Sequence, residues 1–186
     1  GLSREALSTK HGICQRTIFM DQSPFFKFSI VIPTYQRREV VIAGVRALAQ
    51  LESAASFEVI VVVDGSTDGT AEALRSLALP FPLTVLEQAN QGASTARNRG
   101  AEAARGEILL FLDDDMEAHP HLLTEHDRSH RQGADAVIGR LPLHPESPKN
   151  FLSAIVGQWA EERVDKLLAA SDDLPFEEIM TGQLSI

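Results

Sequence analysis

The stretch FEVIVVVDGSTDGT, residues 57–70, is the clearest indication of fold class in the chain. Its first half is a β-branched run that ends at Asp64 and is apolar on both faces, which is typical of a central parallel strand covered by helices. In its second half, Gly65 and Gly69 permit a tight turn, and the residues between them favour the start of a helix over 70–78. The stretch therefore predicts one strand, turn and helix of a parallel sheet.

The same alternation of strand and helix continues on both sides of this unit. Residues 28–33 form an apolar run that stops at Pro33, and apolar residues recur at helical spacing over 39–53. Further strands are expected over 83–88, 107–115 and 134–140, and further helices over 92–104, 121–132 and 151–170. Strict alternation predicts an α/β, Rossmann-like fold with a mostly parallel central sheet flanked by helices.

Composition limits the class of protein. The chain has 186 residues, of which 44% are hydrophobic and 23% charged, as in a globular domain. A formal net charge of −9 without a basic patch argues against a nucleic-acid partner. A single cysteine, Cys14, excludes an internal disulfide framework, and no apolar run approaches the ~18 residues of a membrane span. Because no targeting segment is recognisable, we expect a cytoplasmic protein, with the periphery of a membrane as the alternative.

Three polar clusters follow the expected strands, at the point where each strand ends. They are Pro33-Thr34-Tyr35, Asp64-Gly65-Ser66 and Asp113-Asp114-Asp115. In open parallel sheets, ligands bind beyond the carboxyl ends of the strands. We therefore predict that the three clusters line one site.

The acidic run is the best candidate for a metal site. If the strand extends over 107–115, Asp113 and Asp115 point to the same side, about 7 Å apart. Adjacent carboxylates repel unless a cation lies between them, and oxygen ligands favour Mg²⁺ or Mn²⁺, with substrate phosphates and water completing the shell. The alternative is a solvated acidic turn that caps the next helix.

The clusters and their order resemble the family 2 glycosyltransferases of the GT-A fold. The resemblance spans residues 28–140 and touches 181–186; it is carried by FSIVIPTYQR, VIVVVDGSTDGT, NQGASTARNRGAEAARGEILLFLDDD and TGQLSI. It implies an inverting, metal-dependent transfer of a sugar from a nucleotide-diphosphate-sugar, most commonly a UDP-sugar in this family, to an acceptor hydroxyl. Mn²⁺ or Mg²⁺ would neutralise charge on the leaving diphosphate. The acceptor would be a saccharide or a lipid-linked molecule.

The chain divides into three expected parts. Residues 1–26 are expected to be a leader or N-terminal extension, and residues 27–140 the nucleotide-sugar-binding GT-A core. Three prolines interrupt the sequence after residue 140, so 141–186 is expected to begin an acceptor-side region that is incomplete. The family's general base, a Glu-Asp pair, is expected beyond Ile186.

The resemblance implies roles for residues of the first two clusters and of the helix after them. Pro33 and Tyr35 would pack against the nucleotide base, and Asp64 would accept a hydrogen bond from the base edge. Arg97, in the Ala-Arg-Asn-x-Gly helix, would lie near the ribose and phosphates. The alternative for residues 66–70 is that they only cap a helix.

The resemblance also implies roles for the acidic run, which matches the family's DxD motif. Asp115 would be the metal ligand, with Asp113 as a second candidate, and Asp113 and Asp114 would approach the ribose and the sugar. Gly182 and Gln183 would line the donor-sugar or acceptor side.

Three positions depart from the family pattern. Val63 stands where many members have aspartate, and this change spares the neighbouring residue that faces the base. Gln36 and Gln183 replace asparagines, and the second of these changes bears on sugar recognition.

Two other functions fit part of the pattern. One is a nucleotide-sugar-binding module without turnover. The other is a different Mg²⁺-dependent α/β enzyme, but a nucleotidyltransferase would need a glycine-rich basic loop that TYQRREV lacks, and a phosphatase would need an aspartate where Val62 stands.

Histidines and apolar residues of the second half are assigned structural roles. His126 and His130 are expected on a solvated helix face, because HDRSH lacks the glutamate of a zinc-protease motif. Ile155, Trp159, Val164 and Leu168 are expected to be packing residues, with an acceptor-binding surface or a homodimer contact as the alternatives for Trp159 and its apolar neighbours.

Overall fold

The computed structural model describes residues 26–169 and 182–186. Nearly all of the expected leader, with Cys14, lies outside the described residues, as does Thr181 at the start of TGQLSI. Within the described part, one sheet of six strands has the order β3-β2-β1-β4-β6-β5. The elements follow in the order β1 (Phe26–Thr34), α1 (Arg38–Ala47), η1 (Leu48–Gln50), β2 (Phe57–Asp64), α2 (Thr70–Arg75), β3 (Leu83–Gln88), α3 (Ala93–Ala103), β4 (Gly106–Leu112), α4 (Leu122–Arg131), β5 (Val137–Ile138), α5 (Phe151–Ala169) and β6 (Gln183–Ser185).

The sheet is mostly parallel, as predicted. β1 lies between β2 and β4 and pairs with both in parallel, and β3 continues the parallel order beyond β2. Only β6 runs against its neighbours, β4 and β5. The α/β prediction is therefore confirmed, and the carboxyl ends of β1, β2 and β4 meet at one edge.

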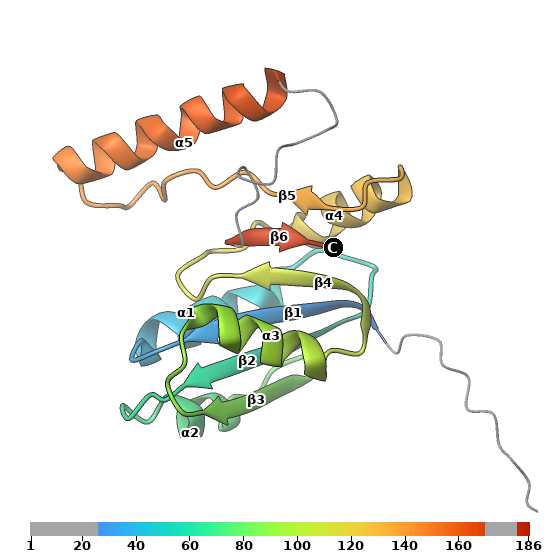
Figure 1. The fold of residues 1–186 in the computed structure, drawn as a ribbon, viewed down its shortest axis with the longest axis vertical. Helices are drawn as coiled ribbons and strands as arrows, with labels where there is room; N and C mark the ends of the chain where they lie inside the picture. Colours follow the sequence, from blue (N-terminus) through green and yellow to red (C-terminus); the bar gives the residue numbers. More distant parts are fainter. Residues whose placement is uncertain (1–25, 170–181) are drawn as a thin grey trace, which may run out of the picture.

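Helices cover both faces of this sheet (Figure 1). Alternate residues of β1, such as Phe28 and Ile30, pack with α1, α2 and α4 in the larger core, and Val31 points to the face covered by α3. α3 approaches closely because Gly100 has no side chain: a Cβ there would lie 2.3 Å from Cγ1 of Val31. Each fully buried aliphatic or aromatic side chain contributes about 1.5–3 kcal/mol, so these two faces hold the strand ends in place.

Two predicted strands are too long in the sequence analysis. The strand expected over 107–115 ends at Leu112, and Asp114 and Asp115 lie in a turn, so their expected placement on one extended strand is wrong. The strand expected over 134–140 is only Val137–Ile138, because its partner β6 is itself three residues long.

Strand β6, which lies between β4 and β5, was not predicted and changes the environment of α4. His126 is buried instead of solvated, because Ser185 of β6 packs on that face of the helix. The hydroxyl of Ser185 lies 2.6 Å from Nδ1 of His126 and 2.7 Å from Nε2 of His130. Since Nδ1 of His130 lies 2.8 Å from the carbonyl of Ala134, it carries a proton, and Ser185 donates to His130 and accepts from His126.

Helix α5 lies beyond the β5–β6 edge of the sheet (Figure 1). Ile155 and Trp159 are half-exposed, so their predicted role as packing residues is wrong, whereas Val164 is partly buried. The side chain of Leu168 lies outside the part of the chain that the structure describes. No helix in the described part of the chain is both long and apolar enough to span a membrane. The cytoplasmic location stays a prediction.

Candidate active site

An open cleft lies at the carboxyl edge of the sheet, where the three polar clusters come together. Its cavity volume is about 440 Å³, within the range of about 300–1,000 Å³ that small-molecule sites occupy. It is lined by Pro33, Thr34, Tyr35, Arg37, Asp64, Ala93, Arg97, Asp113, Asp114 and Asp115. The topology thus brings together residues that are up to 82 positions apart in the chain, counted from Pro33 to Asp115.

The loop after β1 is fastened to the loop after β2 by reciprocal hydrogen bonds. The backbone N–H of Gln36 donates to Oγ of Ser66, and its side-chain amide donates to Oγ1 of Thr67. In return, the backbone N–H of Thr67 donates to Oε1 of Gln36. Gln36 has φ of 52°, a conformation that is uncommon for a residue other than glycine and that asparagine adopts more readily. These contacts compensate for that backbone and fix the direction in which Tyr35 and Arg37 leave the strand.

Asp64 ends β2 with its carboxylate buried and hydrogen-bonded. Oδ1 accepts from Nε2 of Gln88 at 2.8 Å and from the backbone N–H of Gln91 at 2.9 Å, while Oδ2 accepts from the backbone N–H of Gly92 at 2.8 Å. Burial raises the pKa of Asp64, but these hydrogen bonds outweigh it and hold the pKa below its usual value. The carboxylate is therefore ionised at neutral pH, and Oδ2 keeps one lone pair for a further donor.

The acidic turn after β4 is contacted by two arginines from opposite sides. Nη2 of Arg97, on α3, binds Oδ1 of Asp113 at 2.5 Å. Nη1 of Arg37 bridges Oδ1 of Asp114 and Oδ2 of Asp115, at 3.0 Å from each.

Within this turn, Asp114 is the anchored carboxylate. It is buried, and its second oxygen accepts a hydrogen bond of 2.7 Å from the hydroxyl of Thr34. The attraction of Asp114 and then Asp115 raises the pKa of Arg37. Asp115 differs because its side chain is 52% exposed.

The donor set of this turn suits a hard cation only in part. Over residues 26–169 and 182–186, no three histidine, cysteine, aspartate or glutamate side chains are placed to hold a metal ion together. Mg²⁺ is commonly bound through one or two carboxylates, with phosphates and water as the other ligands. The exposed carboxylate of Asp115 fits that arrangement, whereas both oxygens of Asp114 are already engaged.

The predicted residues of TGQLSI lie beside the cleft instead of on its lining. The carbonyl of Gly182 accepts a hydrogen bond from the backbone N–H of Asp113 at 3.1 Å, and a Cβ at Gly182 would lie 3.1 Å from Oδ2 of Asp113. The side chain of Gln183 packs over Gly139, where a Cβ would overlap it. Gly182 thus packs directly against Asp113 at the start of the acidic turn.

Arg37 is the charged residue of the cleft lining to which the sequence assigned no role. Its signal was a basic residue two positions after Tyr35, at the same edge of the sheet as the acidic run. Nothing local connects it to Asp114 and Asp115, which are 77 and 78 residues further along the chain.

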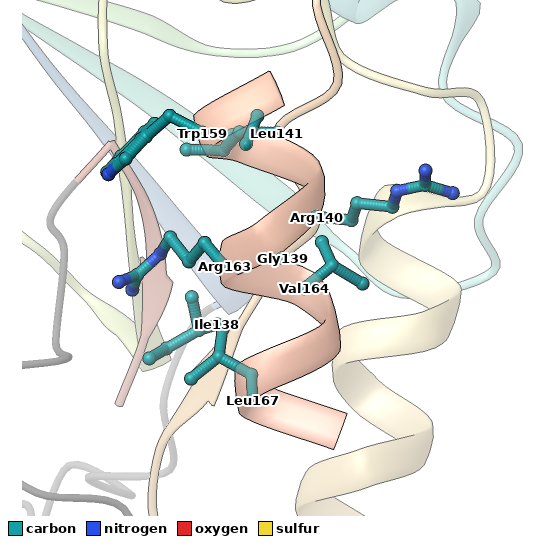
Figure 2. Close-up of a pocket in the computed structure, with 9 residues that line it drawn as sticks. Ile138, Gly139, Arg140, Leu141, Trp159, Arg163, Val164 and Leu167 are labelled. Atoms are coloured by element: carbon teal, nitrogen blue, oxygen red, sulfur yellow. The ribbon is translucent and has the colours of Figure 1, made fainter. Parts of the chain in front are cut away.

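A second, smaller pocket of about 170 Å³ lies between α5 and the segment after β5. Figure 2 shows Trp159, Arg163 and Val164 of α5 across from Ile138 and Leu141. It holds no carboxylate, and it is formed by different elements from those that form the cleft at the ends of β1, β2 and β4.

Comparison with known proteins identifies the fold and the family. The family model described as Glycosyl transferase family 2 matches residues 29–175. YfnE, an uncharacterized glycosyltransferase of Bacillus subtilis, is 32% identical over 157 residues, which cover 78% of this chain and 40% of YfnE.

Solved structures agree with this assignment. TarS of S. aureus in complex with UDP-GlcNAc is 26% identical and superposes with a TM-score of 0.58 over 67% of this chain and 37% of the TarS chain. The mannosyltransferase PcManGT of Pyrobaculum calidifontis, which was solved with GDP-Man and Mn²⁺, has the same fold. It is 21% identical to this chain and superposes with a TM-score of 0.58 over 83% of this chain and 50% of the PcManGT chain.

The chain spans less than half the length of the curated relatives that it matches. The match nevertheless includes every strand that carries the cleft, from β1 to β4. The chain has the GT-A fold and belongs to glycosyl transferase family 2.

Proposed function

We propose that the cleft binds a nucleotide-diphosphate-sugar, with UDP as the nucleotide, and that the protein to which this chain belongs transfers the sugar to an acceptor hydroxyl with inversion. The observation that carries this proposal is the convergence of Asp64, two arginines and the acidic turn in one open cleft of nucleotide size. A structural neighbour, TarS, was solved with UDP-GlcNAc and with UDP, which supports uridine as the base.

The base would lie between the loop after β1 and the end of β2. Tyr35 is half-exposed and offers a ring for stacking, and Pro33 extends that apolar surface. The remaining lone pair of Asp64 Oδ2 would accept an N–H of the base, since this carboxylate is ionised at neutral pH.

The diphosphate would lie toward the arginines. Nε of Arg97 is buried without a hydrogen-bond partner in the described structure, and an unsatisfied buried donor next to a cleft favours an anionic ligand. Asp115, with Asp113 as the second candidate, would hold Mn²⁺ or Mg²⁺ together with the phosphates, and such an ion supplies Lewis-acid neutralisation of the leaving group.

The proposed reaction is a single displacement. The oxygen of the acceptor hydroxyl bonds to the anomeric carbon while the bond from that carbon to the diphosphate oxygen breaks, so the nucleoside diphosphate leaves with the electron pair. The proton of the hydroxyl passes to a carboxylate base, a role that we assign to none of the described residues. In this scheme, the residues of this chain bind and orient the donor and stabilise the charge of the leaving diphosphate.

The test is a calorimetric titration of UDP, GDP and dTDP, each in the presence of Mn²⁺ and again with EDTA. We expect UDP to bind more tightly than the other two, and at least tenfold more tightly with Mn²⁺ than with EDTA. Asp115→Ala should remove this metal dependence, because it deletes the exposed carboxylate.

The matched control is Asp135→Ala, which removes an exposed aspartate outside the cleft and should bind UDP as the wild type does. If no nucleotide binds, or if Asp115→Ala keeps the full effect of Mn²⁺, the assignment of this cleft is wrong.

A further inference from the structure

The two arginines of the cleft are held very differently. Arg97 projects from α3 and its side chain is only 15% exposed, whereas the side chain of Arg37 is 52% exposed. Arg37 is the residue before the first turn of α1, and its side chain makes no capping hydrogen bond to that helix. Its backbone is fixed by the hydrogen bonds that the neighbouring Gln36 makes to Ser66 and Thr67, which we call the Gln36 clamp. The guanidinium of Arg37 can therefore move without any rearrangement of the loop.

The guanidinium of Arg37 lies where positive charge is needed. A single nitrogen, Nη1, contacts one oxygen of Asp114 and one of Asp115, at 3.0 Å from each. Two neighbouring carboxylates repel each other unless a cation lies between them, and here the protein supplies that cation itself. One of these two carboxylates, Asp115, is the exposed group to which the proposed function assigns a divalent ion.

Two cations would compete for the charge of Asp115. A divalent ion that binds Asp115 would meet the charge of Arg37 within a few ångströms, in a cleft where the repulsion is only partly screened. Arg37 would therefore have to leave Asp115 when the ion arrives. The nearest negative charge that could receive it is the diphosphate that arrives with the ion, and a guanidinium matches phosphate oxygens well.

Resting on the function proposed above, we propose that Arg37 is an internal counter-ion: it neutralises Asp114 and Asp115 in the empty cleft, competes with the divalent ion for Asp115, and transfers to the diphosphate when the donor binds. Arg37 is thereby a positioning and binding residue for the donor. It makes the protein bind metal weakly alone and more tightly together with nucleotide.

The experiment measures Mn²⁺ and nucleotide separately in the 186-residue chain. Mn²⁺ alone is titrated by the electron paramagnetic resonance signal of the free ion, and UDP is titrated by calorimetry at saturating Mn²⁺. The variants are Arg37→Ala and Arg37→Lys. The matched control is Arg38→Ala, which removes the same charge from the next residue, whose side chain pairs with Glu39 and is not part of the cleft lining.

The proposal predicts changes of opposite sign. In Arg37→Ala, Mn²⁺ alone should bind about three- to tenfold more tightly than in wild type, because the ion no longer displaces an ion pair. UDP with Mn²⁺ should bind about tenfold more weakly, because a charge-assisted contact to the diphosphate is lost. Arg37→Lys should fall between wild type and Arg37→Ala for both ligands, since an ammonium keeps the charge without the planar geometry of the guanidinium.

The results also separate this inference from the proposed function. If the wild type binds Mn²⁺ and UDP through Asp115 but Arg37→Ala equals Arg38→Ala for either ligand, the role of Arg37 is wrong and the site stands. If Arg37→Ala weakens Mn²⁺ binding, Arg37 is not a competitor and the proposal is overturned. If the wild type binds neither Mn²⁺ nor UDP, both proposals are overturned. Thermal unfolding of the variants checks that each one is folded.

Discussion

The two ends of the central sheet each contain buried carboxylates bound by arginine, yet only one end is open. Toward the amino ends of the strands, Glu58 is buried and accepts hydrogen bonds from the hydroxyl of Ser29 and from the backbone and side chain of Arg105. Both of its oxygens are engaged, and Ser29 in turn accepts from the backbone N–H of Gly106. This network joins β1, β2 and β4 and is complete in itself.

At the carboxyl ends, the charged network is incomplete. Nε of Arg97 is buried without a partner in the described structure, Asp115 is exposed, and one lone pair of Asp64 Oδ2 is left over. Unsatisfied polar groups cost stability, so a protein keeps them where a ligand completes the network. The satisfied charges around Glu58 join the strands, whereas those of Arg97, Asp115 and Asp64 keep hydrogen-bonding capacity for a ligand at the cleft.

The largest effect is expected from breaking the closed end. Glu58→Ala removes the acceptor of the Ser29 hydroxyl and of the backbone and side-chain N–H groups of Arg105, so the free energy of unfolding should fall by about 3–5 kcal/mol through the loss of several charge-assisted hydrogen bonds. Urea denaturation measures the loss, and the affinity for UDP of the protein that remains folded should stay unchanged. Glu58→Gln keeps the shape of the side chain and should lose less stability than Glu58→Ala. A loss below ~1 kcal/mol for Glu58→Ala would contradict the structural role of this network.

The buried His126, whose Nδ1 is hydrogen-bonded to Ser185 while its Nε2 has no partner in the described structure, gives the stability of the protein a dependence on pH. Burial, and then the nearby His130, lower the pKa of His126 from 6.5 to about 4. Between these values the unfolded chain binds more protons than the folded one, so the free energy of unfolding should fall as the pH drops from about 6.5 toward 4. At ~1.36 kcal/mol per pKa unit, the expected loss is about 2–3 kcal/mol.

Urea denaturation at pH 7.5 and pH 4.5 measures this loss. His126→Asn keeps a hydrogen-bond donor for Ser185 but does not titrate, so its stability should depend less on pH than that of the wild type. An equal pH dependence in both proteins would show that the burial of His126 does not cause the effect.

Asp64 has both roles, because its carboxylate is hydrogen-bonded within the protein and also keeps a lone pair for a ligand. A substitution there should therefore affect stability and binding together. In Asp64→Asn a single carbonyl oxygen replaces two acceptors, so either Gln91 or Gly92 loses the acceptor of its backbone N–H. We expect a loss of about 1–2 kcal/mol in stability, measured by denaturation, and weaker binding of UDP, measured by calorimetry. A variant with full stability and reduced affinity would assign Asp64 to binding alone.

The smallest effect is expected at the clamp between the two loops. Gln36→Ala removes the hydrogen bonds to Thr67 and keeps the unfavourable backbone conformation. The free energy of unfolding should therefore fall by about 1 kcal/mol. Gln36→Gly also removes these bonds but tolerates φ of 52°, so it should cost less. The unfolding temperatures of the two variants, measured by thermal shift, test which one is more stable. If Gln36→Ala were more stable than Gln36→Gly, the backbone at Gln36 would not be strained.

The sequence predicted the parallel part of the sheet well, for a local reason. Strands β1, β2 and β3 are largely apolar runs that end at polar residues, and the helices between them show apolar spacing or capping residues. Such patterns report which faces are buried, and they need no knowledge of distant contacts. The same patterns located the three polar clusters at one edge, because parallel strands all point the same way.

Predictions were wrong where the chain returns to the sheet from far away. β6 contributes only Gln183–Ser185, too short to show a period, and its pairing buries His126 and shortens β5. The end of β4 was misplaced because the chain turns at Asp114 and Asp115, which are bound by Thr34 at the end of β1 and by Arg37 in the loop after it. Neither event leaves a signal in the residues that it moves.

What the sequence determined by itself is the order of strands and helices, the edge at which polar residues gather and the family to which the chain belongs. Only the tertiary structure decided the states of the individual charges: that Asp64 is fully buried, that Asp114 is anchored by Thr34 while Asp115 is exposed, and that Arg37 lies between the two aspartates. Periodicity is a local property, whereas the environment of a charge depends on groups that approach through space from 24 to 80 residues away.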